Sequence, residues 1–326
     1  QGLIARLGGD EFAILVQDAA AIDLDLLGGA IVEAISQGVH LTRGDVAVSS
    51  SVGLVIIPQD ANDPGEAMRC ADLALYAAKE SGRGRMRRFE PQLNSVMLAR
   101  LSLARDIRVG IARNEFVPHF QPILDLKDNH VLGFEALLRW RHPTRGDVSP
   151  TEFIPIAESS HLIADLGAFV LRSACQAAQA WTKAGIRGRE VAVNVSAAQV
   201  WHGDLEAAVE DALTVSGLDP SLLCIELTES VFAADALSRL EGILTRLKQR
   251  GVRLALDDFG TGYSSLGYLN RLPFDKLKVD RCFIAGVETA PAKQRVLRGI
   301  VALGRGLGMA VVAEGVETEG ELSIVR

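Results

Sequence analysis

Residues 252–260 read VRLALDDFG, in which an apolar run is closed by two adjacent aspartates, Asp257 and Asp258. Five other apolar runs end in the same way, in carboxylate, amide or ammonium side chains. These are Glu135; Asn194; Glu226 and Glu229; Lys278 and Asp280; and Glu314 and Glu317. In a βα barrel the carboxyl ends of the strands converge on one face, where active sites are built. The repeated pattern therefore predicts that these side chains share one pocket.

The segments around these runs predict strands that alternate with helices. The expected strands are 117–124, 131–138, 191–195, 223–228, 252–257, 276–279 and 310–314, and the expected helices are 151–184, 203–216, 235–250 and 290–308. Strands that are repeatedly followed by helices favour a mostly parallel sheet, either open or closed into a barrel. Only Lys127 to His130 separates the first two strands, which is too short for a parallel crossover and predicts an antiparallel hairpin.

The first 90 residues predict a different order of helices and strands. Residues 3–16 predict a β-hairpin around a Gly-Gly-Asp tip, followed by a helix over 23–37, a strand over 46–57 and a helix over 63–81. Residues 81–115 then carry eight arginines against three acids, with apolar residues near helical spacing. A solvated linker helix packed on one side is the favoured interpretation, and contact with a membrane or nucleic acid is the alternative.

Length and composition bound the class of protein. The chain has 326 residues, 48% of them apolar and 23% charged, as in a soluble globular protein of about two domains. A net charge of −7 argues against binding a nucleic-acid polymer. The four cysteines are widely spaced, and neither a membrane-spanning run nor a signal peptide is evident, so we expect a cytoplasmic chain with reduced thiols. Because the chain starts in a strand and stops in a helix, we also expect a fragment of a longer protein.

The collected side chains predict a metal site. A carboxylate at one strand end is more often a helix cap or an ion-pair partner, but six such ends on successive strands favour a site that handles metal or phosphate. Clustered carboxylates must share protons or recruit cations, and an oxygen-rich set without thiolates selects Mg²⁺ or Mn²⁺. Two such ions suit phosphodiester hydrolysis. Lys278 would then orient the attacking water or, with its pKa lowered by the metals, help to deprotonate it.

The motif series resembles the EAL-domain cyclic di-GMP phosphodiesterases across about 210 residues. It consists of EALLRW (135–140), NVS (194–196), ELTES (226–230), DDFGTGYSSL (257–266), KVD (278–280) and AEGVET (313–318). The resemblance implies an α/β fold, a modified TIM (β/α)8 barrel with one antiparallel strand, that linearises cyclic di-GMP to pGpG. A barrel of this family that ends at Arg326 would lack its last segment and a substrate-side glutamine.

The resemblance also implies roles for individual residues. It implies metal ligation by Glu135, Asn194, Glu226, Asp257, Asp258 and Glu314, with Asp257 bridging two ions and Lys278 activating the water. It implies substrate contacts by Gln121 and Arg139. It assigns a loop that couples dimerisation through the barrel to metal binding, with Glu229, Phe259, Gly260, Thr261, Gly262, Asp280 and Glu317 in or around that loop. His161, which stands where the family usually has glycine, and Trp201-His202 depart from the pattern.

The N-terminal piece resembles the C-terminal half of a GGDEF diguanylate cyclase domain. The matching positions are Gly8, Gly9, Asp10 and Glu11 in the name-giving hairpin, and Lys79 and Arg83 at triphosphate-contacting positions. The expected organisation is therefore a partial α+β GGDEF domain (1–90), a helical linker (91–115) and an incomplete EAL domain (116–326). In the longer protein the first part could bind GTP, as a cyclase or as a regulator of the barrel. A non-catalytic cyclic di-GMP receptor is the alternative to the enzyme, and no membrane contact is expected in this fragment.

Overall fold

The computed structural model describes residues 2–18, 22–41, 44–46, 48–232, 236–260 and 266–326. The chain divides into two compact units, residues 1–102 and 103–326. The helix α3 (Gln92–Ala112) contributes residues to both units. The boundaries expected at residues 90 and 115 stay predictions. Among the described residues, no helix combines the length and the apolar character needed to cross a bilayer.

The first unit opens with the expected hairpin. Strands β1 (Gly2–Gly8) and β2 (Glu11–Val16) are antiparallel, and Gly9 in their turn has a φ of +55°, a conformation that glycine adopts without steric cost. The helices α1 (Leu24–Ser36) and α2 (Pro64–Glu80) confirm the expected ones. Asp63 accepts a hydrogen bond from the backbone N–H of Glu66 at 2.8 Å and so caps α2.

The strand expected over 46–57 is wrong in extent. Short strands β3 (Val39–Leu41) and β4 (Gly44–Val46) pair with each other, while β5 (Val52–Leu54) pairs in parallel with β6 (Met86–Arg88). The chain turns after β5 because Ile56 and Asp60 bond to each other. The Ile56 N–H donates to the Asp60 carboxylate at 2.8 Å, and the Asp60 N–H donates to the Ile56 carbonyl at 2.7 Å. These bonds use backbone groups that a longer strand would need.

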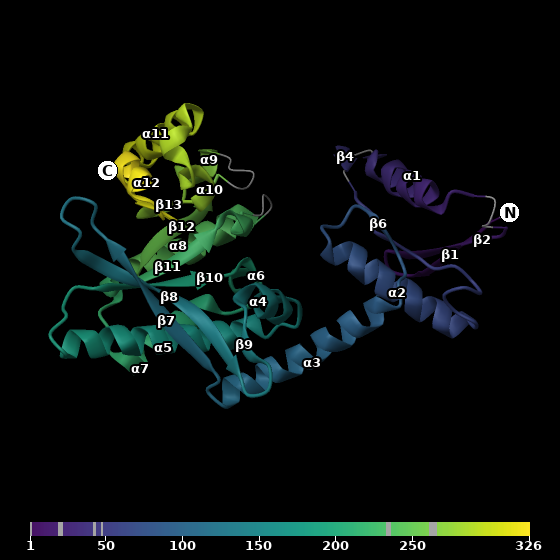
Figure 1. The fold of residues 1–326 in the computed structure, drawn as a ribbon, viewed down its shortest axis with the longest axis horizontal. Coiled ribbons are helices and arrows are strands. Elements are labelled where there is room, and N and C mark those ends of the chain that lie inside the picture. The colour runs from purple at the N-terminus through teal and green to yellow at the C-terminus, as the bar shows by residue number, and fades with distance from the viewer. Residues whose placement is uncertain (1, 19–21, 42–43, 47, 233–235, 261–265) are drawn as a thin grey trace. The chain divides into compact units, whose positions relative to one another are not determined.

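The second unit is built on one curved, mostly parallel sheet (Figure 1). Its strands are β7 (Phe116–Leu124), β8 (Val131–His142), β9 (Gly146–Val148), β10 (Glu190–Val195), β11 (Leu223–Thr228), β12 (Arg253–Phe259), β13 (Lys276–Val279) and β14 (Ala310–Ala313). The spatial order is β14-β13-β12-β11-β10-β8-β7, with β9 beside β8. The β7–β8 pair is antiparallel and β8 and β10 to β14 run in parallel, which confirms the hairpin and the barrel-like α/β fold.

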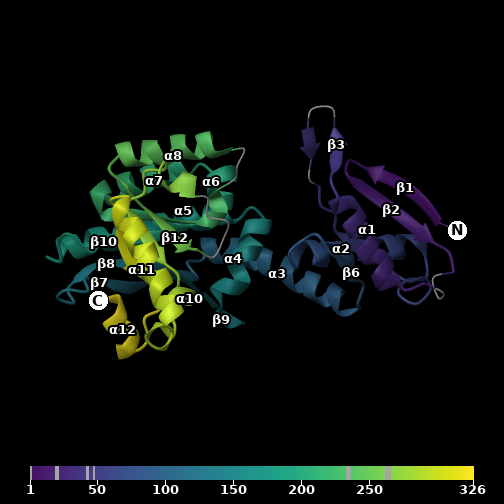
Figure 2. The same cartoon turned by 90° about the horizontal axis from the view of Figure 1, so that it is seen from above.

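Helices connect these strands and pack beside the sheet (Figure 2). They are α4 (Pro150–Ser159), α5 (Ile163–Lys183), α6 (Ala197–His202), α7 (Leu205–Ser216), α8 (Leu237–Gln249), α9 (Leu266–Leu269), α10 (Arg281–Ile284), α11 (Pro291–Gly306) and α12 (Glu319–Val325), with 3₁₀ turns η2 (Pro220–Leu222), η3 (Glu229–Val231) and η5 (Val287–Thr289). The single helix expected over 151–184 is two helices. His161 separates them with a φ of +59°, so this histidine has the backbone conformation that a glycine would favour.

Strand alternation gives the sheet two different faces. Apolar residues such as Val193, Ile225 and Leu256 belong to the large core cluster that the helices share. The opposite face carries a buried cluster of small and apolar residues, Ala192, Cys224 and Ala255 with Ile123 beside them. We call these four residues the dry layer. Charged side chains lie on the same strands before and after the dry layer, at the two ends of the sheet.

Candidate active site

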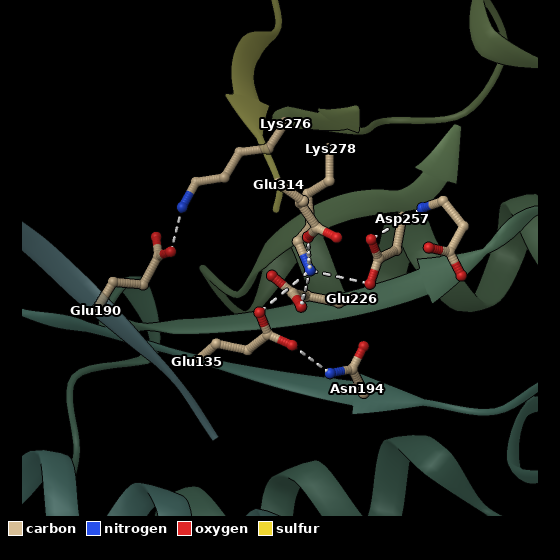
Figure 3. Close-up of polar contacts among 9 residues, drawn as sticks. Glu135, Glu190, Asn194, Glu226, Asp257, Lys276, Lys278 and Glu314 are labelled. Carbon is tan, nitrogen blue, oxygen red and sulfur yellow. Dashed lines mark hydrogen bonds and ion pairs between the residues drawn. The ribbon is translucent and has the colours of Figure 1, made fainter. Parts of the chain in front are cut away.

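A buried ammonium group lies at the centre of the site (Figure 3). Lys278 Nζ contacts Glu226 Oε2 and Glu314 Oε1 at 2.6 Å, Asp257 Oδ2 at 2.9 Å and Glu135 Oε2 at 3.4 Å. We call Lys278 and these four carboxylates the acidic cluster. Asn194 joins it because its amide donates to Glu135 Oε1 at 2.7 Å. The structure therefore brings together side chains that lie on, or directly after, six neighbouring strands of the sheet, β8, β10, β11, β12, β13 and β14.

Parallel register explains how distant residues meet. Asn194 of β10 pairs with Glu226 of β11, and Thr228 of β11 pairs with Asp257 of β12. Glu226 lies two residues after Cys224, and Asp257 lies two residues after Ala255, so each carboxylate shares a face with the dry layer. The apolar runs thus determine which way the charged residues point, and the shared strand direction brings them to one end of the sheet.

Asp258 needs a departure from regular strand geometry. Adjacent residues of a strand normally point to opposite faces, so Asp257 and Asp258 should point away from each other. The β12–β13 pairing is irregular between Leu256 and Phe259, and Asp258 has a φ of +53°. An irregularity of this kind redirects a side chain. One ligand atom from each of Asp257, Asp258 and Glu314 consequently falls within 4.8 Å of the others.

Burial and neighbouring carboxylates raise the pKa values of several acids in and beside the cluster. Burial raises the pKa of Glu226 to about 8 and that of Glu314 to about 7, and neighbouring carboxylates add to both shifts. Burial, with Asp257 and Asp280 nearby, also raises the pKa of Asp258. For Lys278 burial disfavours the charged form, but the surrounding carboxylates outweigh it and raise the pKa. The lowered pKa expected for Lys278 presupposes bound cations and stays a prediction.

The donor set of this cluster fits divalent metal ions. With Asn194 and the neighbouring Asp258, the cluster offers carboxylate and amide oxygens from Glu135, Asn194, Glu226, Asp257, Asp258 and Glu314, without a cysteine or histidine. Hard cations such as Mg²⁺ and Mn²⁺ prefer oxygen ligands. One ammonium does not balance four carboxylates, so cations would relieve the repulsion that remains.

The expected substrate residues lie on the neighbouring strands. Gln121 of β7 pairs directly with Glu135 of β8. Arg139 lies four residues after Glu135, and the strand period of two places both on the same face of β8. The Arg139 guanidinium donates to the Leu138 carbonyl at 2.9 Å.

The expected loop residues are placed around the cluster rather than in it. Glu229 Oε1 accepts the N–H of Gly260 at 2.8 Å, directly after the buried Phe259 that ends β12. Asp280 caps α10 by accepting the Cys282 N–H, and Glu317 forms an exposed ion pair with Arg281 at 3.0 Å. Thr261 and Gly262 lie outside the described residues.

The GGDEF-like positions belong to the first unit. Gly8, Gly9, Asp10 and Glu11 surround the β1–β2 turn, where the Arg6 side chain donates to the Gly9 carbonyl at 2.7 and 3.0 Å. Lys79 lies in the last turn of α2, and Arg83 follows it with a φ of +53°.

A second charged cluster was not anticipated from the sequence. Buried Glu190 accepts a hydrogen bond from Lys276 and contacts Arg253 at 3.2 Å, while Asp275 accepts from Lys248 at 2.6 and 2.8 Å. We call these five residues the basal cluster. Glu190, Arg253 and Lys276 each begin a strand, so they lie at the end of the sheet opposite the acidic cluster. Figure 3 shows Glu190 and Lys276 at a distance from Lys278 and its carboxylates. The sequence signal that could have predicted this cluster is a charged residue at the start of an apolar run.

Two family models match most of the chain. Residues 104–326 match the EAL domain, and residues 1–85 match the diguanylate cyclase, GGDEF domain. An uncharacterized signaling protein of Caulobacter vibrioides is 44% identical over 326 residues, which are 99% of this chain and 39% of that protein. MucR of Pseudomonas aeruginosa, a bifunctional diguanylate cyclase/cyclic di-GMP phosphodiesterase, is 41% identical over 321 residues, which are 98% of this chain and 47% of MucR. The chain thus spans less than half the length of these relatives.

A solved structure agrees with these matches. The PaMucR phosphodiesterase in complex with c-di-GMP superposes with a TM-score of 0.65 and 42% sequence identity. The superposition covers 69% of this chain and 90% of that chain.

Proposed function

The chain belongs to the EAL domain family, and we propose that it hydrolyses cyclic di-GMP to linear pGpG with the help of two divalent cations, Mg²⁺ or Mn²⁺. The acidic cluster carries this proposal. Four carboxylates converge on one buried ammonium at the ends of parallel strands, where βα-barrel enzymes build their active sites. The PaMucR phosphodiesterase, whose structure is similar, was solved with c-di-GMP, which supports the choice of substrate.

The residues divide into metal-holding and substrate-holding groups. Glu135, Asn194, Glu226 and Asp257 would hold one cation, and Asp257, Asp258 and Glu314 would hold the second, with Asp257 shared. Bound there, two divalent cations supply Lewis acidity to the scissile phosphate and lower the pKa of the attacking water. Arg139 would pair with a phosphate oxygen of the substrate, for which a guanidinium is well shaped, and Gln121 would also contact the substrate.

Lys278 would orient the attacking water. Its Nζ atom contacts Glu135, Glu226, Asp257 and Glu314 together. An ammonium held by proposed ligands of both cations is well placed to donate a hydrogen bond to the water or to take part in its deprotonation.

The remaining assignments concern regulation. The Gly260 N–H donates to Glu229 directly after β12, and we propose that the loop that follows, together with Asp280 and Glu317, links homodimer formation through the barrel to metal binding. The GGDEF unit would bind GTP in the longer protein and alter the phosphodiesterase rate. If so, Asp10→Ala should abolish the response to GTP.

The test is the formation of pGpG. The protein is incubated with cyclic di-GMP and Mg²⁺ or Mn²⁺, and the products are separated by chromatography. Glu135→Ala should abolish turnover, whereas Glu241→Ala, which removes a surface glutamate paired with Arg271, should not. Binding of cyclic di-GMP by the unaltered protein without pGpG would contradict the enzyme and favour a receptor.

A further inference from the structure

Glu115 and Trp140 hold the beginning of β7 against the end of β8. The Trp140 indole Nε1–H donates to Glu115 Oε2 at 3.1 Å, and the Arg141 N–H donates to the Glu115 carbonyl at 3.0 Å. Hydrogen bonds to a charged acceptor are stronger than those between neutral groups. One residue, Glu115, therefore fixes two consecutive residues of β8, and both directly follow Arg139.

The Trp140 indole has no freedom to move on its own. It is 1% exposed, stacks on Phe116 with ring centroids 4.8 Å apart, and meets Phe153 and His142 edge to face at 5.7 and 5.3 Å. A buried indole N–H without an acceptor destabilises the folded state, and the Glu115 carboxylate supplies that acceptor. We call Trp140 and its partners Glu115, Phe116, His142 and Phe153 the aromatic box. The box makes the position of Trp140 a fixed point on β8.

The consequence for the site follows from strand geometry. Trp140 and Arg139 are neighbours on β8, so their side chains point to opposite faces of the sheet. The aromatic box fixes the backbone of β8 from the Trp140 face, and Arg139 extends from the other face at the adjacent residue. Leu138, on the same face as Trp140, packs against the core. A shift of the Trp140 backbone would therefore carry the Arg139 guanidinium with it.

Helix α3 closes over the same bond. The Glu115 N–H donates to the Gly110 carbonyl at 3.0 Å. A Cβ added to Gly110 would lie 3.0 Å from the Phe116 ring and 3.1 Å from both Glu115 Oε2 and Trp140 Nε1. A glycine at this point of α3 lets the helix approach the bond without displacing either partner.

We propose that Glu115 is a positioning residue for substrate binding: through Trp140 it sets where β8 presents Arg139 to a phosphate of the cyclic dinucleotide. This assignment rests on the proposed function of the acidic cluster and deepens it. In this assignment Glu115 acts through Trp140 and Arg139 and not by contact with the substrate or the cations. Its removal should weaken nucleotide binding through Arg139 and leave the chemical step at the acidic cluster intact.

The experiment compares Glu115→Ala, Glu115→Gln, Trp140→Phe, Arg139→Ala and the double variants with Arg139→Ala. KM and kcat are measured by pGpG formation, or the Kd for cyclic di-GMP by calorimetry if the nucleotide binds without turnover. Arg139→Ala should weaken binding by about 100-fold, the loss expected for a hydrogen bond between charged groups. Glu115→Ala and Trp140→Phe should each raise KM by about 10-fold with little change in kcat, because a small misplacement of a binding group is costly.

The conservative variant and the double variants separate positioning from stability. Glu115→Gln keeps an oxygen acceptor and should stay within about 3-fold of the unaltered protein. In the Arg139→Ala background Glu115→Ala should have no further effect, since the group that it positions is gone. Gly110→Ala tests the same bond in a chain that retains Glu115 and Trp140, and it should raise KM in the same direction.

Three outcomes would overturn the assignment. One is a Glu115→Ala protein with a lower melting temperature but an unchanged KM or Kd, which is what a purely structural role predicts. Another is full additivity of Glu115→Ala and Arg139→Ala. The third is an unaltered protein that fails to bind cyclic di-GMP, which would overturn the proposed function as well. Binding without turnover would contradict only the enzyme, because the Kd comparison still decides the role of Glu115.

Discussion

The acidic and basal clusters are built on the same strands, yet their charge balance is opposite. At the carboxyl ends four carboxylates surround one ammonium, Lys278. At the amino ends Glu190 meets two cations, Lys276 and Arg253, and Asp275 meets Lys248. Removing charges from water is costly unless each finds a partner. The basal cluster has at least one cation for each carboxylate, whereas the acidic cluster has one cation for four carboxylates.

This difference separates a structural network from a candidate binding site. Each cluster contains at least one buried carboxylate and at least one lysine, and β13 contributes Lys276 to one and Lys278 to the other. Burial and ion pairing alone therefore do not mark function. The excess of carboxylates over cations marks the end of the sheet where we propose that cations bind.

The largest contrast should come from neutralising one carboxylate at each end. Asp257→Asn removes the proposed shared ligand without changing shape, and we expect turnover to fall by about 10³-fold, the size associated with losing one electrostatic stabiliser of a transition state. Glu190→Gln should leave turnover within about 3-fold, since it lies in the basal cluster. Steady-state assays check both, with circular dichroism to confirm folding. Near-normal turnover in Asp257→Asn would refute the ligand assignment.

The next contrast is the response to metal. Mn²⁺ or Mg²⁺ at about 100 times its Kd should stabilise the unaltered protein by roughly 2.7 kcal/mol, because ligands that bind only the folded state stabilise it by mass action. Thermal melts with and without the ion measure this gain. Glu190→Gln should keep the gain and Asp257→Asn should lose it. Equal gains in the two variants would place the cations somewhere other than the acidic cluster.

In the absence of metal, a substitution in the basal cluster should change the free energy of unfolding more than one in the acidic cluster. Glu190→Gln leaves Lys276 and Arg253 facing an uncharged amide in a buried setting, and we expect a loss of about 2 kcal/mol, below the range for breaking a fully buried pair because Arg253 is half exposed. Urea denaturation in a chelator measures the loss. A basal cluster that contributes nothing to stability would show no change in the midpoint.

The smallest expected effect is an increase in the free energy of unfolding, where Glu190→Gln should lower it. Asp258→Asn removes one of three carboxylates whose oxygens lie within 4.8 Å, so repulsion falls and the metal-free protein should gain a few tenths of a kcal/mol. The same urea experiment, run beside Glu190→Gln, compares the two signs directly. A loss of stability in Asp258→Asn would show that the acidic cluster is already balanced without cations.

Much of the site could be predicted because its signals are local. Each apolar run defines a strand, each polar residue at its end defines a position, and parallel strands bring those positions together. Glu135, Asn194, Glu226, Asp257, Lys278 and Glu314 meet for this reason. The short turn between β7 and β8 likewise left only an antiparallel pairing.

Other features depend on contacts between distant segments. The conformation of Asp258 arises from an irregularity in the β12–β13 pairing, and no pattern within VRLALDDFG announces it. The break at His161 escapes a helix prediction because histidine does not signal a left-handed backbone as glycine does. The Glu115–Trp140 bond joins residues 25 positions apart.

The dry layer between the two clusters contains a natural electrostatic probe. The Cys224 thiol is buried, and its raised pKa responds to burial first and then to Glu190 and Lys276 on one side and Glu226 on the other. The thiol therefore stays protonated, and its S–H bond lies in the electric field of the charged clusters at both ends of the sheet. The infrared stretching band of that bond, isolated by subtraction of a Cys224→Ala spectrum, should shift when cations enter the acidic cluster, giving a label-free measure of occupancy.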